Sequence, residues 1–370
     1  MELAQFNALH SQVLWAAFAV AAVFGFIAQR THFCTMGAIS DIVNMGDWTR
    51  MRMWAMAVGV AAIGFYGMAA LGWIDPKQSF YTAGRIVWLS ALVGGALFGF
   101  GMVLGSGCGS KTLVRIGGGS LKGVVVFLAM GVAAFMTLRG VFAVVRVNTV
   151  DRVAFELPAG GALPNWLSSG LGWSAGQAGL VAALVVGGAL VIWALASRDF
   201  RQANNLLAGL GIGLTVAAMW WVSGRLGFVA EHPETLDAVF LGSNSGRMES
   251  LTFTAPMAYT IDWLIFFSDS SKVLTFGVVT VVGVVLGSFV SSLLDRSFRW
   301  EGFRSTQDTA LHLAGGLLMG VGGVTALGCT IGQGLSGLST LSLTSLLAVV
   351  GIVLGALLGF RFQMWLLERE

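Results

Sequence analysis

The sequence predicts an all-α polytopic membrane protein, and three observations point to this fold class. Hydrophobic residues make up 56% of the 370 residues and charged residues only 11%, against about 25% in soluble domains. The mean hydropathy is +0.81. Several stretches contain no Asp, Glu, Lys or Arg, and the longest, 309–360, exceeds a single helical crossing and must fold back on itself.

About nine segments are long and apolar enough to cross a hydrocarbon core of roughly 30 Å as helices. They are 12–29, 53–74, 86–107, 122–145, 176–197, 204–223, 273–294, 309–328 and 341–361. A further apolar segment at 250–267 is interrupted by Pro256 and Asp262. We expect it to form a short interfacial or re-entrant helix, and a tenth span is the alternative.

The Lys and Arg residues predict how the chain is oriented. With the N-terminus outside, 13 of the 21 Lys and Arg residues fall in inner loops, so the C-terminus is expected in the cytoplasm. No Lys or Arg precedes the first apolar run, so we expect no signal peptide. The net charge of +3, without a long basic run, excludes a nucleic-acid partner and leaves the lipid bilayer as the main surroundings.

An internal repeat is visible in the sequence. GGALFGFGMVLGSGC (94–108) aligns without gaps to GGLLMGVGGVTALGC (315–329), so that Cys108 corresponds to Cys329. In the predicted topology the two copies run in opposite directions, as in transporters that place a substrate site between inverted repeats. We therefore expect one membrane domain made of two repeats, 1–175 with Cys34 and Cys108, and 176–370 with Cys329.

Each of the three cysteines follows an apolar helix and precedes a short segment rich in Gly, Ser and Thr. Such a segment is too polar to face lipid, and non-helical backbone at membrane depth is tolerated only inside protein or along a cavity. We expect three short re-entrant Gly-rich elements that present Cys34, Cys108 and Cys329 to a common axis. The alternative is that each cysteine is a small buried hydrophobic residue.

The chemistry open to these cysteines is limited. Their spacing offers no disulfide framework and no C-x-x-C pair, and only His32 lies beside a cysteine, which argues against metal, cofactor and enzymatic roles. A protonated thiol is a soft, weak donor, which suits a sulfur-containing anion. Neighbouring glycines allow close approach of backbone N–H groups. The predicted substrate-binding residues are Cys34, Cys108, Cys329, Gly107, Gly109, Gly328, Thr330 and Gly332.

Charged residues near these elements have two interpretations each. Lys111 and Arg115 are either topology charges or groups that attract anions to the inner mouth. Asp41 caps a helix or pairs with Arg30 or Arg52. Arg139 falls inside the fourth apolar run, where a charged residue suggests a functional role. The alternative is that it lies near the outer interface and extends its side chain toward water, and we do not expect it to bind substrate.

GSGCGSKT (105–112) shares letters with a phosphate-binding loop, but Ser110 replaces the second glycine. A nucleotide site would also need a soluble strand before the loop and a helix after it, which the composition does not offer. Nucleotide binding is therefore the weakest hypothesis. A membrane thiol oxidoreductase and a purely structural subunit remain as alternatives to transport.

Three segments resemble the signatures of the YeeE/YedE family of bacterial inner-membrane sulfur-compound transporters: QRTHFCTMGAISD (29–41), GSGCGSKTLVRIGGGSLKG (105–123) and ALGCTIGQGLSGLSTLSL (326–343). The resemblance covers nearly the whole chain. It implies thiosulfate uptake, with pore-lining cysteines matching Cys34, Cys108 and Cys329 that pass the substrate along by S–H contacts.

Some relatives are associated with selenium or other sulfur compounds, which leaves the substrate open. The resemblance also implies a small cytoplasmic sulfur-carrier-like protein as a partner, although no residue of this chain requires one.

Overall fold

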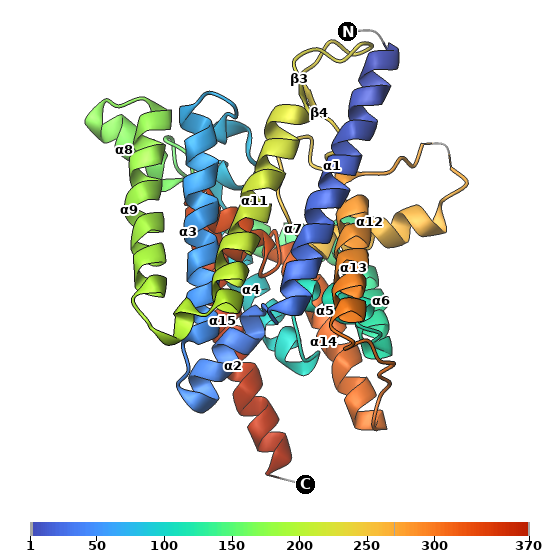
Figure 1. The fold of residues 1–370 in the computed structure, drawn as a ribbon. Helices are drawn as coiled ribbons and strands as arrows, with labels where there is room; N and C mark the ends of the chain where they lie inside the picture. Colours follow the sequence, from blue (N-terminus) through green and yellow to red (C-terminus); the bar gives the residue numbers. More distant parts are fainter. Residues whose placement is uncertain (1–2, 270, 369–370) are drawn as a thin grey trace.

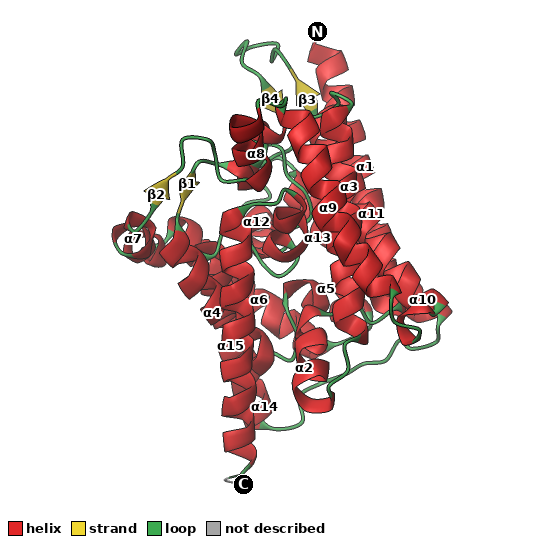
Figure 2. Cartoon of the chain, turned by 90° about the vertical axis from the view of Figure 1, so that its left-hand side faces the viewer, coloured by secondary structure: helices red, strands yellow, loops and turns green. Residues whose placement is uncertain are grey.

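The structure, a computed structural model, describes residues 3–269 and 271–368 as a bundle of helices with two small strand pairs (Figures 1 and 2). The α-helices are α1 (Leu3–Arg30), α2 (Thr35–Met45), α3 (Thr49–Ala70), α4 (Trp88–Leu104), α5 (Gly109–Gly117), α6 (Leu121–Arg139), α7 (Val141–Asn148), α8 (Leu163–Leu171), α9 (Ala175–Leu195), α10 (Ala203–Leu206), α11 (Ile212–Trp221), α12 (Thr254–Ile265), α13 (Phe276–Leu294), α14 (Thr306–Thr325) and α15 (Leu343–Leu367).

The strands form two short antiparallel pairs. Strand β1 (Arg85–Ile86) pairs with β2 (Phe155–Glu156), and β3 (Phe228–Val229) pairs with β4 (Val239–Phe240). The pair β3–β4 lies at the end of the bundle that carries the N-terminus, and the C-terminus lies at the opposite end (Figure 2). Which end faces the cytoplasm stays a prediction.

Eight helical stretches within the described residues are long and apolar enough to cross a membrane, which establishes the all-α polytopic fold. They match eight of the nine predicted spans. The remaining one, 309–328, forms α14, which is 20 residues long but less apolar because Asp308 and His312 lie in its first turns. The span predicted at 204–223 is built from α10, α11 and two π-helical segments, Leu207–Gly211 and Val222–Leu226.

One of the predicted boundaries is corrected. The fourth span does not run to residue 145, because α6 ends at Arg139 and Gly140, with φ −101° and ψ −154°, separates it from α7. Arg139 is therefore exposed at a helix end and not enclosed within a span. Segment 250–267 contains the predicted short helix, the 12-residue α12, which is about 18 Å long and therefore too short for the alternative of a tenth span.

The repeated glycines bring α4 and α14 together as an antiparallel pair. A Cβ atom added to Gly94 would lie 2.8 Å from the carbonyl oxygen of Gly322, and one added to Gly322 would lie 2.6 Å from that of Gly94. The same reciprocal contact joins Gly101 and Gly315, at 2.8 and 2.6 Å. Because Gly94 and Gly101 correspond to Gly315 and Gly322 in the repeat, the two contacts are equivalent by an approximate two-fold rotation.

The neighbouring helices obey the same relation. Gly95 of α4 packs against the backbone of α15, and its repeat counterpart Gly316 packs against the backbone of α6. Each repeated helix therefore contacts the span that follows the other repeated helix. These contacts tie the two halves of the chain into one interlocked bundle, while the repeat boundary near residue 175 stays a prediction.

Candidate functional site

The three cysteines share one backbone arrangement. A long helix ends at a residue in the left-handed region two positions before each cysteine: His32 (φ 53°), Ser106 (φ 55°) and Leu327 (φ 59°). The following N–H donates to the carbonyl five residues back, at 3.2 Å from Phe33 to Ala28, 2.8 Å from Gly107 to Met102 and 2.8 Å from Gly328 to Gly323. This Schellman closure turns the chain sharply, so that each cysteine begins a new, short helix.

The cysteines lie at the starts of these short helices. Cys34 precedes α2 and accepts a hydrogen bond on Sγ from the Gly37 N–H at 3.4 Å. Cys329 accepts one from the Gly332 N–H, also at 3.4 Å, and leads into η7, a π-helical segment over Gly332–Gly337. Cys108 caps α5, and its Sγ lies 3.2 Å from Ser110 Oγ. Each sulfur thus sits at a helix N-terminus, where the backbone field favours negative charge.

The fold brings the three elements together. The thiols of Cys34 and Cys108 lie within interaction distance of each other, and Cys108 lies beside the Thr330 side chain, next to Cys329 in the chain. Cys108 and Cys329 are fully buried, Cys34 is half-buried, and all three are free thiols. The predicted glycines Gly107, Gly109, Gly328 and Gly332 are buried around them.

A cavity of about 320 Å³ lies beside the Cys329 element, with Gly328 in its lining. Its lining includes Tyr81, Glu249, Thr252, Tyr259, Leu327 and Gly328. Thr252 Oγ1 is 4.0 Å from Cys329 Sγ, and the Tyr81 hydroxyl contacts Thr252. Burial raises the pKa of Tyr81, which keeps its hydroxyl protonated as a donor. The Glu249 carboxylate accepts hydrogen bonds from Ser243 Oγ at 2.6 Å and from Ser245 N at 3.0 Å, so its charge is partly satisfied within its own loop.

The opposite side of the cysteines is basic. Lys111 is half-buried, and its charge acts on the thiols of Cys34 and Cys108. Across the described residues it forms no salt bridge. Arg115, by contrast, pairs with Glu301 at 3.8 Å. Of the two predicted anion-attracting residues, only Lys111 combines closeness to the thiols with a charge free of a carboxylate partner.

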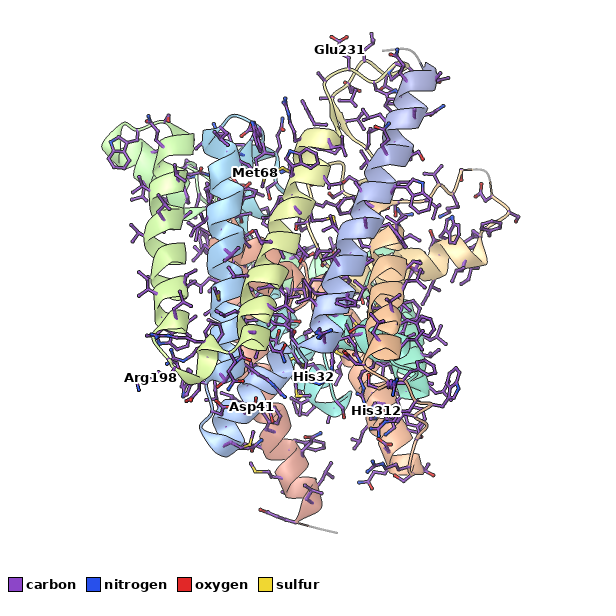
Figure 3. The ribbon with its side chains drawn as sticks, in the orientation of Figure 1. His32, Asp41, Met68, Arg198, Glu231 and His312 are labelled. Atoms are coloured by element: carbon purple, nitrogen blue, oxygen red, sulfur yellow. The ribbon has the colours of Figure 1, made fainter. Side chains whose placement is uncertain are left out.

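Asp41 has a different partner from the two predicted. It pairs with Arg50, with 3.3 Å between Asp41 Oδ2 and Arg50 Nε. Arg30 pairs with Asp295 at 3.7 Å, and Arg52 donates to the carbonyl of Trp193. Figure 3 shows His32 and Asp41 toward the end of the bundle away from Glu231, which places the Cys34 element on the side opposite the β3–β4 loop.

The sequence reasoning missed Tyr81 and Thr252. Tyr81 lies in the short 3-10 helix Phe80–Thr82 and Thr252 in the irregular segment before α12, and neither belongs to the repeat or to a cysteine motif. Only the tertiary fold shows that these segments close over Cys329. Polar residues between two apolar segments are too common for position alone to have identified them.

Comparison with known proteins identifies the family of the chain. Residues 30–358 match the family described as sulphur transport. The chain is 27% identical to the thiosulfate transporter TsuA of Escherichia coli strain K12 over 344 residues, which is 90% of each chain. It is 26% identical to TsuA of Spirochaeta thermophila over 361 residues, covering 93% of this chain and 97% of the relative.

A shorter match reaches the probable transporter YedE of Salmonella typhimurium, 30% identical over 111 residues, 30% of this chain and 25% of the relative. All of these relatives are named as transporters and not as enzymes. Because the family match spans most of the chain and includes all three cysteine elements, the protein belongs to the sulphur transport family of multi-pass membrane transporters.

Proposed function

We propose that this protein takes up thiosulfate, or a closely related sulfur anion, by passing it along Cys329, Cys108 and Cys34. The observation that carries the proposal is the meeting of three free cysteines between a cavity on one side and the unpaired Lys111 on the other. The naming of two relatives as thiosulfate transporters supports the substrate.

The cavity beside Cys329 is the proposed entrance. Tyr81 and Thr252 offer hydroxyl donors on its lining, and the Cys329 thiol lies 4.0 Å from Thr252 Oγ1. A small anion that enters there exchanges water for these donors before it reaches the buried thiols. The approach of a sulfur to a thiol is favourable because both are polarizable and weakly hydrated.

The three thiols act as successive weak donors. A protonated S–H binds an anion less tightly than a cationic side chain does, and conduction needs contacts weak enough to release. The N-termini of α2 and α5 and the N–H groups that open η7 supply the positive field. A thiolate would repel the anion, so the proposal requires that the thiols stay protonated.

Lys111 marks the proposed exit. With the predicted orientation, N-terminus outside, the cavity opens outward and Lys111 faces the cytoplasmic mouth. Its charge draws the anion past Cys34 without a carboxylate competing for it. A small cytoplasmic sulfur-carrier-like protein is proposed to receive the product on this side of the membrane.

Growth of a bacterial strain that lacks sulfate and thiosulfate uptake tests the proposal. With this chain as the only added transporter, we expect growth on thiosulfate as sole sulfur source, and sulfate and selenite serve as comparison substrates. Each of Cys34→Ala, Cys108→Ala and Cys329→Ala is expected to reduce the initial uptake of labelled thiosulfate about tenfold or more, because a contact to a charged ligand is lost. Normal uptake in all three folded variants would refute the cysteine pathway, and growth on none of the substrates would refute the substrate.

A further inference from the structure

The turn before Cys108 is closed by a side chain from the short helix that follows it. Arg115, in the last turn of α5, donates from Nη1 to the carbonyl oxygen of Ser106 at 3.2 Å. Ser106 is the left-handed residue of this turn, with φ 55°. A residue other than glycine seldom keeps this conformation unless surrounding contacts hold it. The bond from Arg115 therefore fixes the backbone two residues before the Cys108 thiol.

The turn before Cys329 is closed in the same way. Gln333 donates from Nε2 to the carbonyl oxygen of Ala326 at 2.6 Å, next to Leu327, the left-handed residue of this turn (φ 59°). In the repeat, Leu327 corresponds to Ser106. Gln333 is 1% exposed and Ala326 is fully buried, so water does not replace this bond when it is lost. Both copies of the repeat thus have a donor that reaches back past the cysteine to the turn.

The Arg115 side chain is also held by an acidic residue. Its Nη2 lies 3.8 Å from Glu301 Oε2, in the loop between α13 and α14. The backbone fixes Glu301 in turn, because its N–H donates to Gly119 at 3.2 Å and its carbonyl accepts from Leu121 at 2.9 Å. The carboxylate offsets the guanidinium charge and orients the fork of N–H groups. Arg115 is therefore poorly suited to attract an anion and well suited to hold the turn.

We infer that Arg115 and Gln333 are positioning residues, which keep the two repeated thiols in line for the transfer of the anion. This inference rests on the proposed function. An S–H group is a weak donor, and a hydrogen bond weakens steeply when its geometry changes, so a small displacement of either sulfur interrupts the pathway. The two closing bonds act on the rate at which the anion passes between thiols and not on its capture.

This role separates Arg115 from Lys111, the other basic residue near Cys108. Across the described residues Lys111 forms no salt bridge, and its charge acts on the anion from a distance, where salt screens it. Arg115 acts through contacts of defined geometry within the protein. Loss of Arg115 should therefore lower the rate at any ionic strength, whereas loss of Lys111 should lower the affinity mainly at low salt.

Labelled thiosulfate uptake by the purified full chain in proteoliposomes tests the inference with Arg115→Met and Gln333→Met. Each substitution keeps an unbranched side chain and removes the donor. We expect the maximal rate per transporter, kcat, to fall about fivefold or more in each, with KM within about twofold of the wild-type value at low and at high salt. Arg115→Lys keeps the charge but lacks the fork that reaches Ser106 and Glu301 together, so it should recover little of the rate.

Chemical labelling of the cysteines gives a second readout. Because each closing bond holds one turn, Arg115→Met should increase the labelling of Cys108 by a small methanethiosulfonate reagent, and Gln333→Met should increase that of Cys329. Mass spectrometry of the labelled chain identifies the site. A general loss of structure would instead expose both thiols in either variant.

Arg201→Met is the matched control. Arg201 Nε donates to the carbonyl oxygen of Leu195 at 2.8 Å, which is the same kind of bond at the end of α9, a helix at the edge of the bundle (Figure 1). Because this bond holds no cysteine, kcat, KM and the labelling of Cys108 and Cys329 should be unchanged.

A raised KM with unchanged kcat in Arg115→Met, or full activity of Arg115→Lys, would overturn the inference and assign Arg115 to attraction of the anion. Wild-type kinetics in both Met variants, or equal labelling of both thiols in each, would overturn it as well. Absence of thiosulfate uptake by the wild-type protein would instead overturn the proposed function. If one Met variant does not fold by thermal melting, the other Met variant and Arg115→Lys decide the question in the same way.

Discussion

Gly94 of α4 and Gly322 of α14 lie backbone to backbone, and each occupies the space that a side chain on the other would need. This contact joins the two halves of the internal repeat at a position where their helices cross. Its two-fold equivalent, Gly101 with Gly315, lies at the other end of the same crossing. The helices that deliver Cys108 and Cys329 are therefore held in register by glycines.

Replacing one of these glycines should destabilise the bundle. In Gly322→Ala the new methyl group would overlap the backbone of α4, so we expect a loss of about 1–3 kcal/mol in unfolding free energy. Thermal unfolding in detergent measures the effect. Gly67→Ala in α3, where a Cβ meets nothing within 4 Å, is the control and should be neutral or slightly stabilising. Equal melting temperatures of the two variants would contradict the close contact between α4 and α14.

Lys111 should matter for substrate capture more than for folding. We expect Lys111→Gln to raise the KM for thiosulfate about tenfold at low salt, with a smaller effect at high salt because screening weakens the field. Lys111→Arg should keep most of the affinity. Lys77→Gln removes the same charge from an exposed position in another part of the chain and serves as the control. A wild-type KM in Lys111→Gln at low salt would show that this lysine only sets topology.

Cys34 should be the thiol most open to chemical modification. It is half-buried, whereas Cys108 and Cys329 are fully buried. A small anionic methanethiosulfonate reagent should therefore label Cys34 first, and mass spectrometry of the intact chain identifies the site. Labelling from the cytoplasmic side only would support the predicted orientation.

Thiosulfate present during the reaction should slow the labelling, and Cys34→Ala should abolish it. Preferential labelling of Cys329, by contrast, would contradict the burial of the three thiols that the structure shows.

Lys122 and Asp308 should act as a buried link between the halves. Lys122 is 6% exposed, and its Nζ lies 2.8 Å from Asp308 Oδ2. Lys122 Nζ also lies 3.8 Å from Glu301 Oε1, so Asp308→Asn leaves the buried ammonium with only this longer contact and should cost about 1–3 kcal/mol. The double variant Lys122→Met with Asp308→Asn should recover part of this loss. Thermal unfolding of the single and double variants measures the coupling free energy between Lys122 and Asp308. Strictly additive effects of the two substitutions would show that the two residues are not coupled.

Much of the fold could be predicted because its signals are local. Long stretches without charged residues predict membrane-spanning helices regardless of their packing partners. In lipid the backbone N–H and C=O groups must be hydrogen-bonded within the segment, and a helix does this by itself. Prediction from local signals was less accurate at two places. In α14, Asp308 and His312 make the helix less apolar than the other predicted spans. At Gly140, α6 ends six residues before the predicted boundary, and no proline or run of charged residues in the sequence indicates this end.

Composition and local pattern were enough to predict that the chain crosses the membrane many times, that residues 94–108 recur at 315–329, and that each cysteine follows a helix end. These properties depend on composition and on neighbours in the chain. Only the tertiary structure decided that Cys34 meets Cys108, that Asp41 pairs with Arg50, and that Tyr81 and Thr252 close over Cys329. Such contacts join segments far apart in the sequence, and they are set by how the helices pack, which no local pattern encodes.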